Sequence, residues 1–315
     1  MRCSAVVLAA TLGAGLQAFA QVDQGLLNLV PAGTRILAGI QVTQGKVSPF
    51  GQYLLQQAQK QDPQFQKLLD DTGFDPRSDL QEVLFAANGG SAGTHSRPLI
   101  IARGSFDPQR VKAAVTAKGG QVETFQGVDI LSGKQGDNGG VAFLDATLAV
   151  LGSRTVLHTL IQNRDTPTTL DPELAKRMEA VSSGNEAWFA SIVPGTDIPA
   201  KADLNLNGQQ INGAVLQGVL ESSGGVHFAS DALNINFDAV TRSDKDAQSL
   251  SDVIRFLAGM AQTQAQDQAQ LALLAPSLNA MQLTTDGAAT HVSLSIPEKT
   301  AEQLLAQSSN AKHGQ

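Results

Sequence analysis

Hydrophobic residues follow two different periods along the chain, and each change of period marks a new element. Residues 35–42 (RILAGIQV), 80–87 (LQEVLFAA) and 97–104 (RPLIIARG) are short runs rich in apolar and β-branched side chains, which is typical of strands. The Gly- and Ser-rich loop 88–96 (NGGSAGTHS) joins the second run to the third. Because strands joined by a short loop must be antiparallel, we expect these two to form a pair.

Helix starts are marked by a capping residue that is followed by proline or by an apolar period of three to four residues. Ser48 precedes Pro49 and Asp107 precedes Pro108, the arrangement of an N-cap and the first helical position. Ser153 is expected to cap a third helix. These signals predict helices over residues 50–60, 109–118 and 154–164, with a shorter helix over 64–71.

The elements recur in the order strand, strand, helix, strand, strand, helix. After the helix at 109–118, residues 121–133 and 140–152 are each expected to form one strand before the helix at 154–164. The C-terminal part repeats the order, with strands and helices expected at 224–230, 232–242, 244–260, 281–287, 289–297 and 298–307. A helix at 171–181 and a strand at 186–195 lie between the two parts.

This order predicts an α+β fold in which antiparallel sheet is covered by helices on one face and two pseudo-repeats of β-β-α-β-β-α are present. We expect an N-terminal domain over residues 21–200, a C-terminal domain over 201–308 and a disordered tail over 309–315. The two halves either form separate sheets or join edge to edge into one. Residues 262–270 (QTQAQDQAQ) are expected to form a solvated helix or a mobile connection.

Residues 1–20 have the pattern of a cleavable secretory signal. Arg2 gives a positive start, residues 5–16 are continuously apolar, and Ala18 and Ala20 are small residues placed where a signal peptidase reads them. The apolar stretch is shorter than the roughly 20 residues that cross a membrane. We therefore expect cleavage after Ala20 and a periplasmic or secreted protein without a transmembrane segment, with an uncleaved N-terminal anchor as the alternative.

Cleavage would also remove Cys3, the one cysteine among the 315 residues. The mature chain could then form no disulfide, and thiolate catalysis and cysteine-ligated metal centres would be excluded. Loss of Arg2 would leave 21 basic residues against 29 acidic ones, a formal charge of −8 in place of −7. Because an acidic surface without a basic cluster repels phosphate backbones, we expect no nucleic-acid partner.

Ser91 lies in a G-x-S-x-G pattern, residues 89–93, which resembles the nucleophile elbow of hydrolases. That elbow requires a helix immediately after the serine, whereas another strand is expected here, at 97–104. His95 follows in the same loop, although a catalytic triad takes its base from elsewhere in the fold. The pattern therefore favours a hairpin loop, and a hydrolase that uses Ser91 remains the rival hypothesis.

Residues 203–208 (DLNLNG) match the first six positions of an EF-hand loop. The twelfth position, which needs a bidentate glutamate, is Ala214. Leu204 and Leu206 alternate as in a strand, and Asn207-Gly208 is a favoured hairpin turn, so we expect a hairpin here. The five histidines show no metal-binding spacing, and no metal or other cofactor is expected.

A repeated motif, Phe74-Asp75-Pro76-Arg77 and Phe106-Asp107-Pro108-Gln109-Arg110, is expected to have a structural role. Phenylalanine would be buried, aspartate would cap a helix and proline would take the first helical position. The sequence contains no arrangement that identifies a catalytic, cofactor-binding or metal-binding residue.

Residues 29–42 (LVPAGTRILAGIQV), 48–57 (SPFGQYLLQQ) and 72–86 (TGFDPRSDLQEVLFA) resemble a group of exported bacterial proteins of unknown function. That group shares a strand after a V-P-x-x-[ST] entry and repeated units of a strand pair plus a helix. The resemblance implies export and an α+β fold, and it transfers no site residue. We expect a non-enzymatic protein that acts by binding an unidentified protein or small molecule, or in a structural role. Besides the Ser91 hydrolase, a carrier of apolar small molecules is an alternative.

Overall fold

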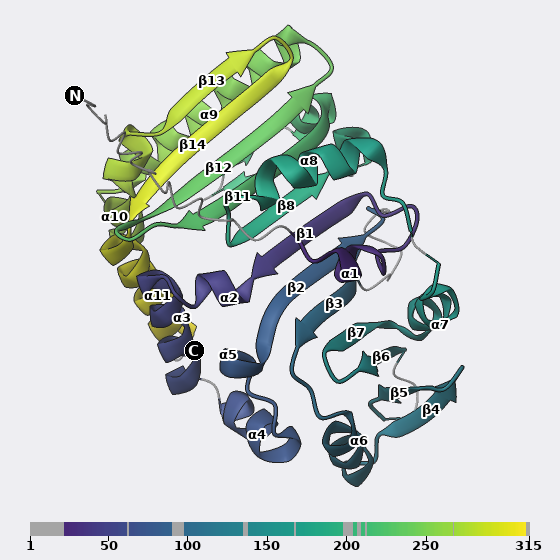
Figure 1. The fold of residues 1–315 in the computed structure, drawn as a ribbon. Helices are drawn as coiled ribbons and strands as arrows, with labels where there is room; N and C mark the ends of the chain where they lie inside the picture. Colours follow the sequence, from purple (N-terminus) through teal and green to yellow (C-terminus); the bar gives the residue numbers. More distant parts are fainter. Residues whose placement is uncertain are drawn as a thin grey trace, which may run out of the picture.

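The computed structural model describes residues 22–61, 63–89, 98–134, 138–166, 168–197, 204–206, 209–211, 213–266 and 268–312. Its centre is one twelve-stranded sheet with the order β13-β14-β12-β11-β8-β1-β2-β3-β7-β6-β5-β4 (Figure 1). The strands of this sheet are β1 (Ile36–Gln41), β2 (Leu80–Ala87), β3 (Leu99–Gly104), β4 (Gln121–Phe125), β5 (Val128–Ser132), β6 (Gly139–Asp145), β7 (Leu148–Ser153), β8 (Ala187–Ser191), β11 (Val219–Phe228), β12 (Ala232–Thr241), β13 (Gln282–Asp286) and β14 (Ala289–Pro297). Each strand is antiparallel to its neighbours. The protein is therefore a mixed α+β structure with a large antiparallel sheet.

The helices begin close to the predicted caps. Ser153 accepts a hydrogen bond from the backbone N–H of Val156, and Asp107 accepts one from that of Arg110. The helices are α1 (Gln24–Leu27), α2 (Val42–Gly45), α3 (Pro49–Gln61), α4 (Pro63–Thr72), α5 (Pro76–Asp79), α6 (Pro108–Ala117), α7 (Arg154–Asn163), α8 (Pro172–Ser182), α9 (Asp244–Gln264), α10 (Ala269–Asn279) and α11 (Glu298–Lys312), with 3₁₀ turns at Gly195–Asp197 and Gly213–Gly218.

Helices cover both faces of the sheet, which differs from the expected cover of one face. Glu221 on β11 forms an ion pair with Arg177 of α8, and the hydroxyl of Thr290 on β14 donates to a backbone carbonyl of α9 (3.2 Å). Glu221 pairs with Val240 in the register, whereas Thr290 pairs with Ala239. Because neighbouring residues of a strand point to opposite faces, α8 and α9 lie on opposite sides (Figure 1). The apolar period of a helix shows that one side is buried but not which face of a sheet it covers.

Two of the expected strands are each divided into a hairpin. Residues 121–133 form β4 and β5, which are joined at Gln126 and Gly127. Both residues have positive φ (46° and 79°), the requirement of a type I′ turn. Residues 140–152 are likewise divided between β6 and β7. The N-terminal part therefore contains two more strands than the expected order, because tight turns within apolar runs went unrecognised.

The sheet continues from the N-terminal part into the C-terminal part, so the second of the two expected arrangements is present. The link is β8, which pairs with β1 on one side and with β11 on the other. Helix α11 extends to Lys312, into the region expected to be a disordered tail. The expected solvated connection contains the end of α9 at Gln264 and the start of α10 at Ala269.

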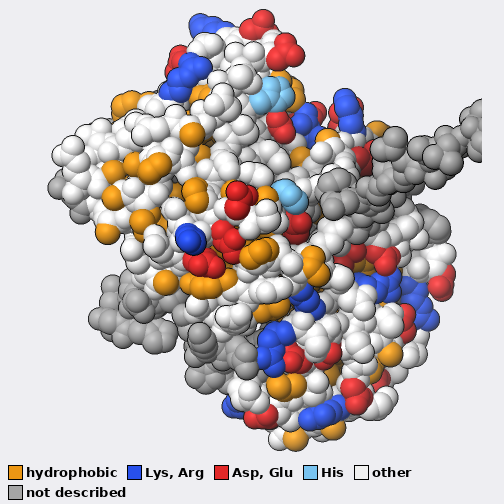
Figure 2. Space-filling view, turned by 60° about the vertical axis from the view of Figure 1, so that its left-hand side comes forward, with side chains coloured by type: hydrophobic (Ala, Val, Ile, Leu, Met, Phe, Trp, Pro, Cys, Tyr) orange, Lys and Arg blue, Asp and Glu red, His pale blue; other side chains and the backbone are white. Residues whose placement is uncertain are grey.

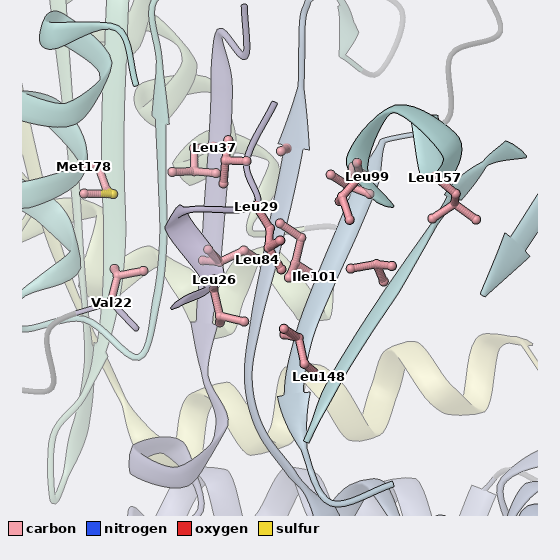
Figure 3. Close-up of a cluster of buried hydrophobic side chains, with 14 of the residues drawn as sticks. Val22, Leu26, Leu29, Leu37, Leu84, Leu99, Ile101, Leu148, Leu157 and Met178 are labelled. Carbon is pink, nitrogen blue, oxygen red and sulfur yellow. The ribbon is translucent and has the colours of Figure 1, made fainter. Parts of the chain in front are cut away.

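The main hydrophobic core lies under α1, α7 and α8 (Figure 3). Leu26 of α1, Leu157 of α7 and Leu174 of α8 are completely buried, and they pack with Leu84 and Ile101 of the sheet. Burial of one such side chain stabilises a fold by about 1.5–3 kcal/mol. The short helix α1 is thus held as a core element, although it has only four residues.

The opposite face carries an apolar row that crosses every strand of the sheet. Successive cross-strand partners in this row are Leu283, Val292, Phe237, Gly224, Phe189, Ala38, Phe85, Ile100, Leu151, Val141, Leu131 and Val122. Helix α9 covers one end of this face, and α6 covers the other through the Lys112–Asp129 ion pair (2.6 Å). Near the middle, Ile40 and Leu151 are 41% and 37% exposed. Figure 2 shows one side of the molecule, on which several hydrophobic side chains are exposed on the left, and charged side chains lie at the top, near the centre and in the lower part.

Candidate functional site

A hollow of about 620 Å³ lies between the chain that follows α1 and the exposed side of α7. We call it the α1–α7 groove. Leu29, Pro31 and Ala32 form one wall, and Val156 and Leu160 of α7 form the apolar part of the other. Binding sites for small molecules commonly have volumes of about 300–1,000 Å³ and mainly apolar linings. The groove therefore has the size and lining of a small-molecule site.

Polar side chains form the rim of the groove. Thr155, Thr159 and Asn163 follow one another at intervals of four residues, so they lie along one side of α7. The Thr159 hydroxyl donates to the carbonyl of Thr155 (3.1 Å). Asn28 faces them from the other wall, and Arg164 stands at the end of α7. Hydroxyl and amide groups thus surround an apolar floor and can orient a bound molecule.

The first wall is held in place by Asp23, the N-cap of α1. Its carboxylate accepts hydrogen bonds from the backbone N–H groups of Gly25 (2.6 Å) and Leu26 (3.3 Å). Arg103 on β3 donates to both oxygens of the same carboxylate, at 3.1 and 3.0 Å. Burial raises the pKa of Asp23, but the hydrogen bonds and charge of Arg103, together with the two N–H groups, outweigh it and leave this pKa below its ordinary value.

A second carboxylate, that of Glu82 on β2, is buried beneath the first. It accepts hydrogen bonds from the side-chain amide of Gln41 (2.8 Å) and from the backbone N–H of Asp23 (3.3 Å). Burial raises the pKa of Glu82 above its ordinary value, and the nearby Asp23 charge acts in the same direction. Asp23, Glu82, Gln41 and Arg103 together fasten the start of the described chain to the sheet.

A smaller hollow of about 140 Å³ adjoins the groove. It shares Pro31, Ala32 and Val156 with the groove and reaches Ala86 and Leu99 at the end of the β2–β3 pair. The hollow space therefore extends from the end of α7 to the ends of β2 and β3.

The Ser91 hypothesis falls on residues that the structure does not describe. Ser91 and His95 both lie outside the described residues, as do residues 1–21 with the expected cleavage site. The next described element after this loop is β3, which is antiparallel to β2. The first described element after the G-x-S-x-G pattern is thus a strand, which begins at Leu99.

The EF-hand-like segment contains a strand pair, β9 (Leu204–Leu206) and β10 (Gln209–Ile211). Leu206 pairs with Gln209, which agrees with the predicted hairpin. Asp203, Asn207 and Gly208 lie outside the described residues.

Three of the five histidines are described, and each stands beside one carboxylate in a different part of the fold. His158 of α7 lies 2.8 Å from Glu123 on β4, His227 lies 3.2 Å from Glu186, and His291 contacts Asp238. His95 and His313 lie outside the described residues. In the part of the chain that the structure describes, no three His, Cys, Asp or Glu side chains are grouped to hold a metal ion.

The two Phe-Asp-Pro motifs lie next to each other. The rings of Phe74 and Phe106 stack with their centres 5.3 Å apart. Asp75 caps α5 by accepting from the backbone N–H of Arg77 (2.9 Å), and Asp107 caps α6. The hydrogen bonds of Arg77 lower the pKa of Asp75, and burial opposes this effect. Both motifs therefore build helix entries, as the sequence predicts, but Phe74 and Phe106 are half-buried and not fully buried as expected.

Sequence reasoning did not find the residues of the α1–α7 groove. Threonine and asparagine on one side of the predicted helix at 154–164 are equally typical of a solvated surface. The wall that contains Pro31 comes from a segment more than a hundred residues earlier in the chain, and its approach to α7 is a property of the fold. The alternation of Thr155, Thr159 and Asn163 with apolar Val156 and Leu160 was the available signal.

The chain matches no known protein-family model, and no curated protein sequence is similar to it. Its fold is similar to crystal structures of TP0453. Crystal form III covers 89% of this chain and 97% of its own length, with a TM-score of 0.53 and 9% identity. Form IV has a TM-score of 0.52 at 11% identity, and form I covers 92% of this chain with a TM-score of 0.50. At such low identity the similarity shows a shared fold and nothing about function.

Among the described helices, none combines the length and the hydrophobicity that crossing a membrane requires.

Proposed function

We propose that this is an exported binding protein without enzymatic activity, and that it takes a small, largely apolar molecule into the α1–α7 groove. The observation that carries the proposal is the hollow of about 620 Å³ with an apolar floor and a polar rim. Apolar area removed from water drives binding, and the hydroxyl and amide groups of the rim fix orientation. This role unites the binding and carrier hypotheses that the sequence supports.

The rigidity of the groove supports the same role. One wall is fastened by the Arg103–Asp23 pair, and the other belongs to α7, whose Leu157 is completely buried. A preformed site loses less conformational entropy when a ligand binds, so affinity rises without additional contacts.

Export is the second part of the proposal, and it rests on residues 1–20. Mass spectrometry of the protein recovered from its native cells tests it directly, and the expected N-terminal residue is Gln21. A protein that retains Met1 or Arg2 in the membrane fraction would contradict export with cleavage and favour the uncleaved anchor.

The binding role is tested by filling the groove. Thr159 is exposed on the groove side of α7, so Thr159→Trp should occupy the hollow without disturbing the core. We expect the wild-type protein to bind the neutral fluorescent dye Nile red, and Thr159→Trp to lose most of this binding. Thr116→Trp is the matched control, because Thr116 is exposed on α6, away from the groove. Equal dye binding by all three proteins would reject the groove as the site.

The rival is a hydrolase that uses Ser91. Ester hydrolysis by the purified protein that disappears in Ser91→Ala would favour this rival and contradict the non-enzymatic role. Under our proposal neither protein hydrolyses esters above the rate of buffer.

We also propose that both halves of the chain descend from one repeated unit, which consisted of a strand pair and a helix and has since changed in each half. The C-terminal part has the order β11, β12, α9, α10, β13, β14, α11. In the N-terminal part the segment from β2 to α7 has the order β2, β3, α6, β4, β5, β6, β7, α7. Superposition of the unit β2–β3–α6 on β11–β12–α9 with matching strand direction and helix side would support this origin.

A further inference from the structure

We infer that the ligand of the α1–α7 groove carries a single carboxylate at one end of an apolar body, and that Arg164 binds this carboxylate. The inference rests on the proposed function, because it names the chemical class of the molecule that would occupy the same groove. Of the described residues that line the groove, Arg164 alone carries a charge. It follows the last residue of α7, and Thr166, Thr168 and Thr169 continue the lining beyond it.

The guanidinium group of Arg164 is available for a ligand. Its contact with Asp165 joins atoms 3.9 Å apart, which is beyond hydrogen-bond distance. The side chain of Asp165 is 95% exposed, so water weakens its attraction for Arg164. A carboxylate inside the groove could instead accept two parallel hydrogen bonds from the guanidinium group, the geometry in which arginine binds carboxylates most strongly.

The dipole of α7 and the negative net charge of the chain both oppose the binding of an anion, and together they limit the ligand to one negative charge. The C-terminal end of a helix has the effect of roughly half a negative charge, which opposes an anion near Asn163 but is smaller than the full positive charge of Arg164. The net charge of the chain, −7, acts at longer range and is screened beyond about 8 Å at physiological salt. A dianion such as a phosphate monoester would exceed what one arginine can neutralise.

The remaining lining fits the rest of such a molecule. Val156, Leu160 and Leu29 provide the apolar surface of the groove, and the side-chain amide of Asn163 can donate a hydrogen bond to an oxygen of the carboxylate. A long-chain carboxylate therefore matches both the apolar floor of the groove and its one charged side chain among the described residues.

The test is displacement of Nile red by three molecules with the same alkyl chain: dodecanoate, dodecanol and dodecyltrimethylammonium, each below its micelle concentration. We expect dodecanoate to bind the wild-type protein most tightly. Arg164→Gln should weaken dodecanoate binding about tenfold or more, since a hydrogen bond to a charged group contributes about 1.5–3 kcal/mol, and should leave dodecanol binding unchanged. Arg154→Gln is the matched control, because this arginine on the same helix faces Glu123 (3.3 Å) and not the groove.

A second variant changes the charge in the opposite direction. Asp165→Asn removes the neighbouring negative charge, so it should strengthen dodecanoate binding severalfold without affecting dodecanol. If dodecanoate and dodecanol bind equally and neither variant alters their ratio, the carboxylate inference is wrong, while apolar binding in the groove stands. If Thr159→Trp fails to reduce the binding of any of the three molecules, the proposed function itself is wrong.

Discussion

Arg103 on β3 donates hydrogen bonds of 3.1 and 3.0 Å to the two carboxylate oxygens of Asp23, which lies 80 residues earlier in the sequence. Asp23 is at once the N-cap of α1 and one member of this pair. The pair thus joins the first described residues to the middle of the sheet, and it supports one wall of the α1–α7 groove.

Replacement of Arg103 by glutamine should loosen α1. The side chains of Arg103 and Asp23 are 22% and 35% exposed, so solvent screens part of their attraction. We expect the free energy of unfolding to fall by about 1–2 kcal/mol. Urea unfolding followed by the fluorescence of Trp188, the single tryptophan and 3% exposed, measures this change. Arg255→Gln is the control, because its pair with Asp252 is 3.5 Å long and exposed; an equal loss in both variants would contradict a special role for Arg103.

The stability of the protein should respond to pH through Glu82. Burial raises the pKa of this carboxyl in the folded state, so the folded protein holds the proton more tightly than the unfolded chain does. The contribution of Glu82 to stability is therefore present at acidic pH and is lost as the pH rises through the raised pKa. Glutamine at position 82 cannot titrate. As the pH rises from 4 to 8, the free energy of unfolding of wild type should therefore fall relative to that of Glu82→Gln.

The pKa of Asp23 is shifted downward, which has the opposite consequence. Its contribution to stability is present above the ordinary pKa of aspartate and is lost as the pH falls through the lowered value. Denaturation curves of Asp23→Asn and Glu82→Gln, measured over the same pH series, separate the two carboxylates. Parallel pH profiles for both variants and wild type would show that neither group has a shifted pKa.

Gly39 and Trp188 are packed so closely that no side chain fits between them. A Cβ atom at position 39 would lie 2.4 Å from the indole ring. Gly39→Ala should therefore destabilise the fold by about 1–3 kcal/mol and shift the fluorescence of Trp188. Gly259→Ala provides the contrast, because this residue lies inside α9 with open space around its Cβ position, and it should stabilise the protein by about 0.5–1 kcal/mol. The prediction fails if alanine is tolerated equally at both positions.

The exposed part of the apolar row should promote association between protein molecules. Ile40, which neighbours the row on β1, and Leu151, within it, are 41% and 37% exposed, so Ile40→Ser with Leu151→Ser removes exposed apolar area together with the buried part of both side chains. We expect this double variant to aggregate less at high concentration in its folded state, and its free energy of unfolding to fall by about 2–4 kcal/mol. Light scattering against protein concentration measures the first effect. Unchanged aggregation would show that this surface does not promote association between molecules.

Local signals in the sequence predicted local structure well. Ser153, Asp107 and Asp75 cap the helices that were expected to start beside them, because a cap depends on residues within one helical turn. The antiparallel pairs β2–β3 and β11–β12 were likewise recognisable from short apolar runs. The turn at Gln126-Gly127 was missed, since an apolar run on both sides of it reads as one strand.

Relationships between distant segments were not predictable in the same way. Which face of the sheet α8 or α9 covers depends on packing across the whole fold, and the amphipathic pattern of a helix is the same in both cases. The candidate site could not be predicted for the same reason, because it too depends on how distant segments pack. Arg164 and Pro31 have no sequence pattern in common, and the groove exists because α7 lies beside the chain that leaves α1.

The place of β1 in the sheet affects how the chain acquires its structure. One side of β1 finds its partner early, in β2, but the other side pairs with β8, where Ile36 is matched with Ser191. A growing chain must therefore keep one side of β1 unpaired until residue 191 has been made, and unpaired strand edges invite contact with other molecules. We therefore expect the incomplete chain to be most prone to association with other molecules while β1 lacks β8, so a pause in translation between residues 42 and 186 should cause more aggregation than a later pause.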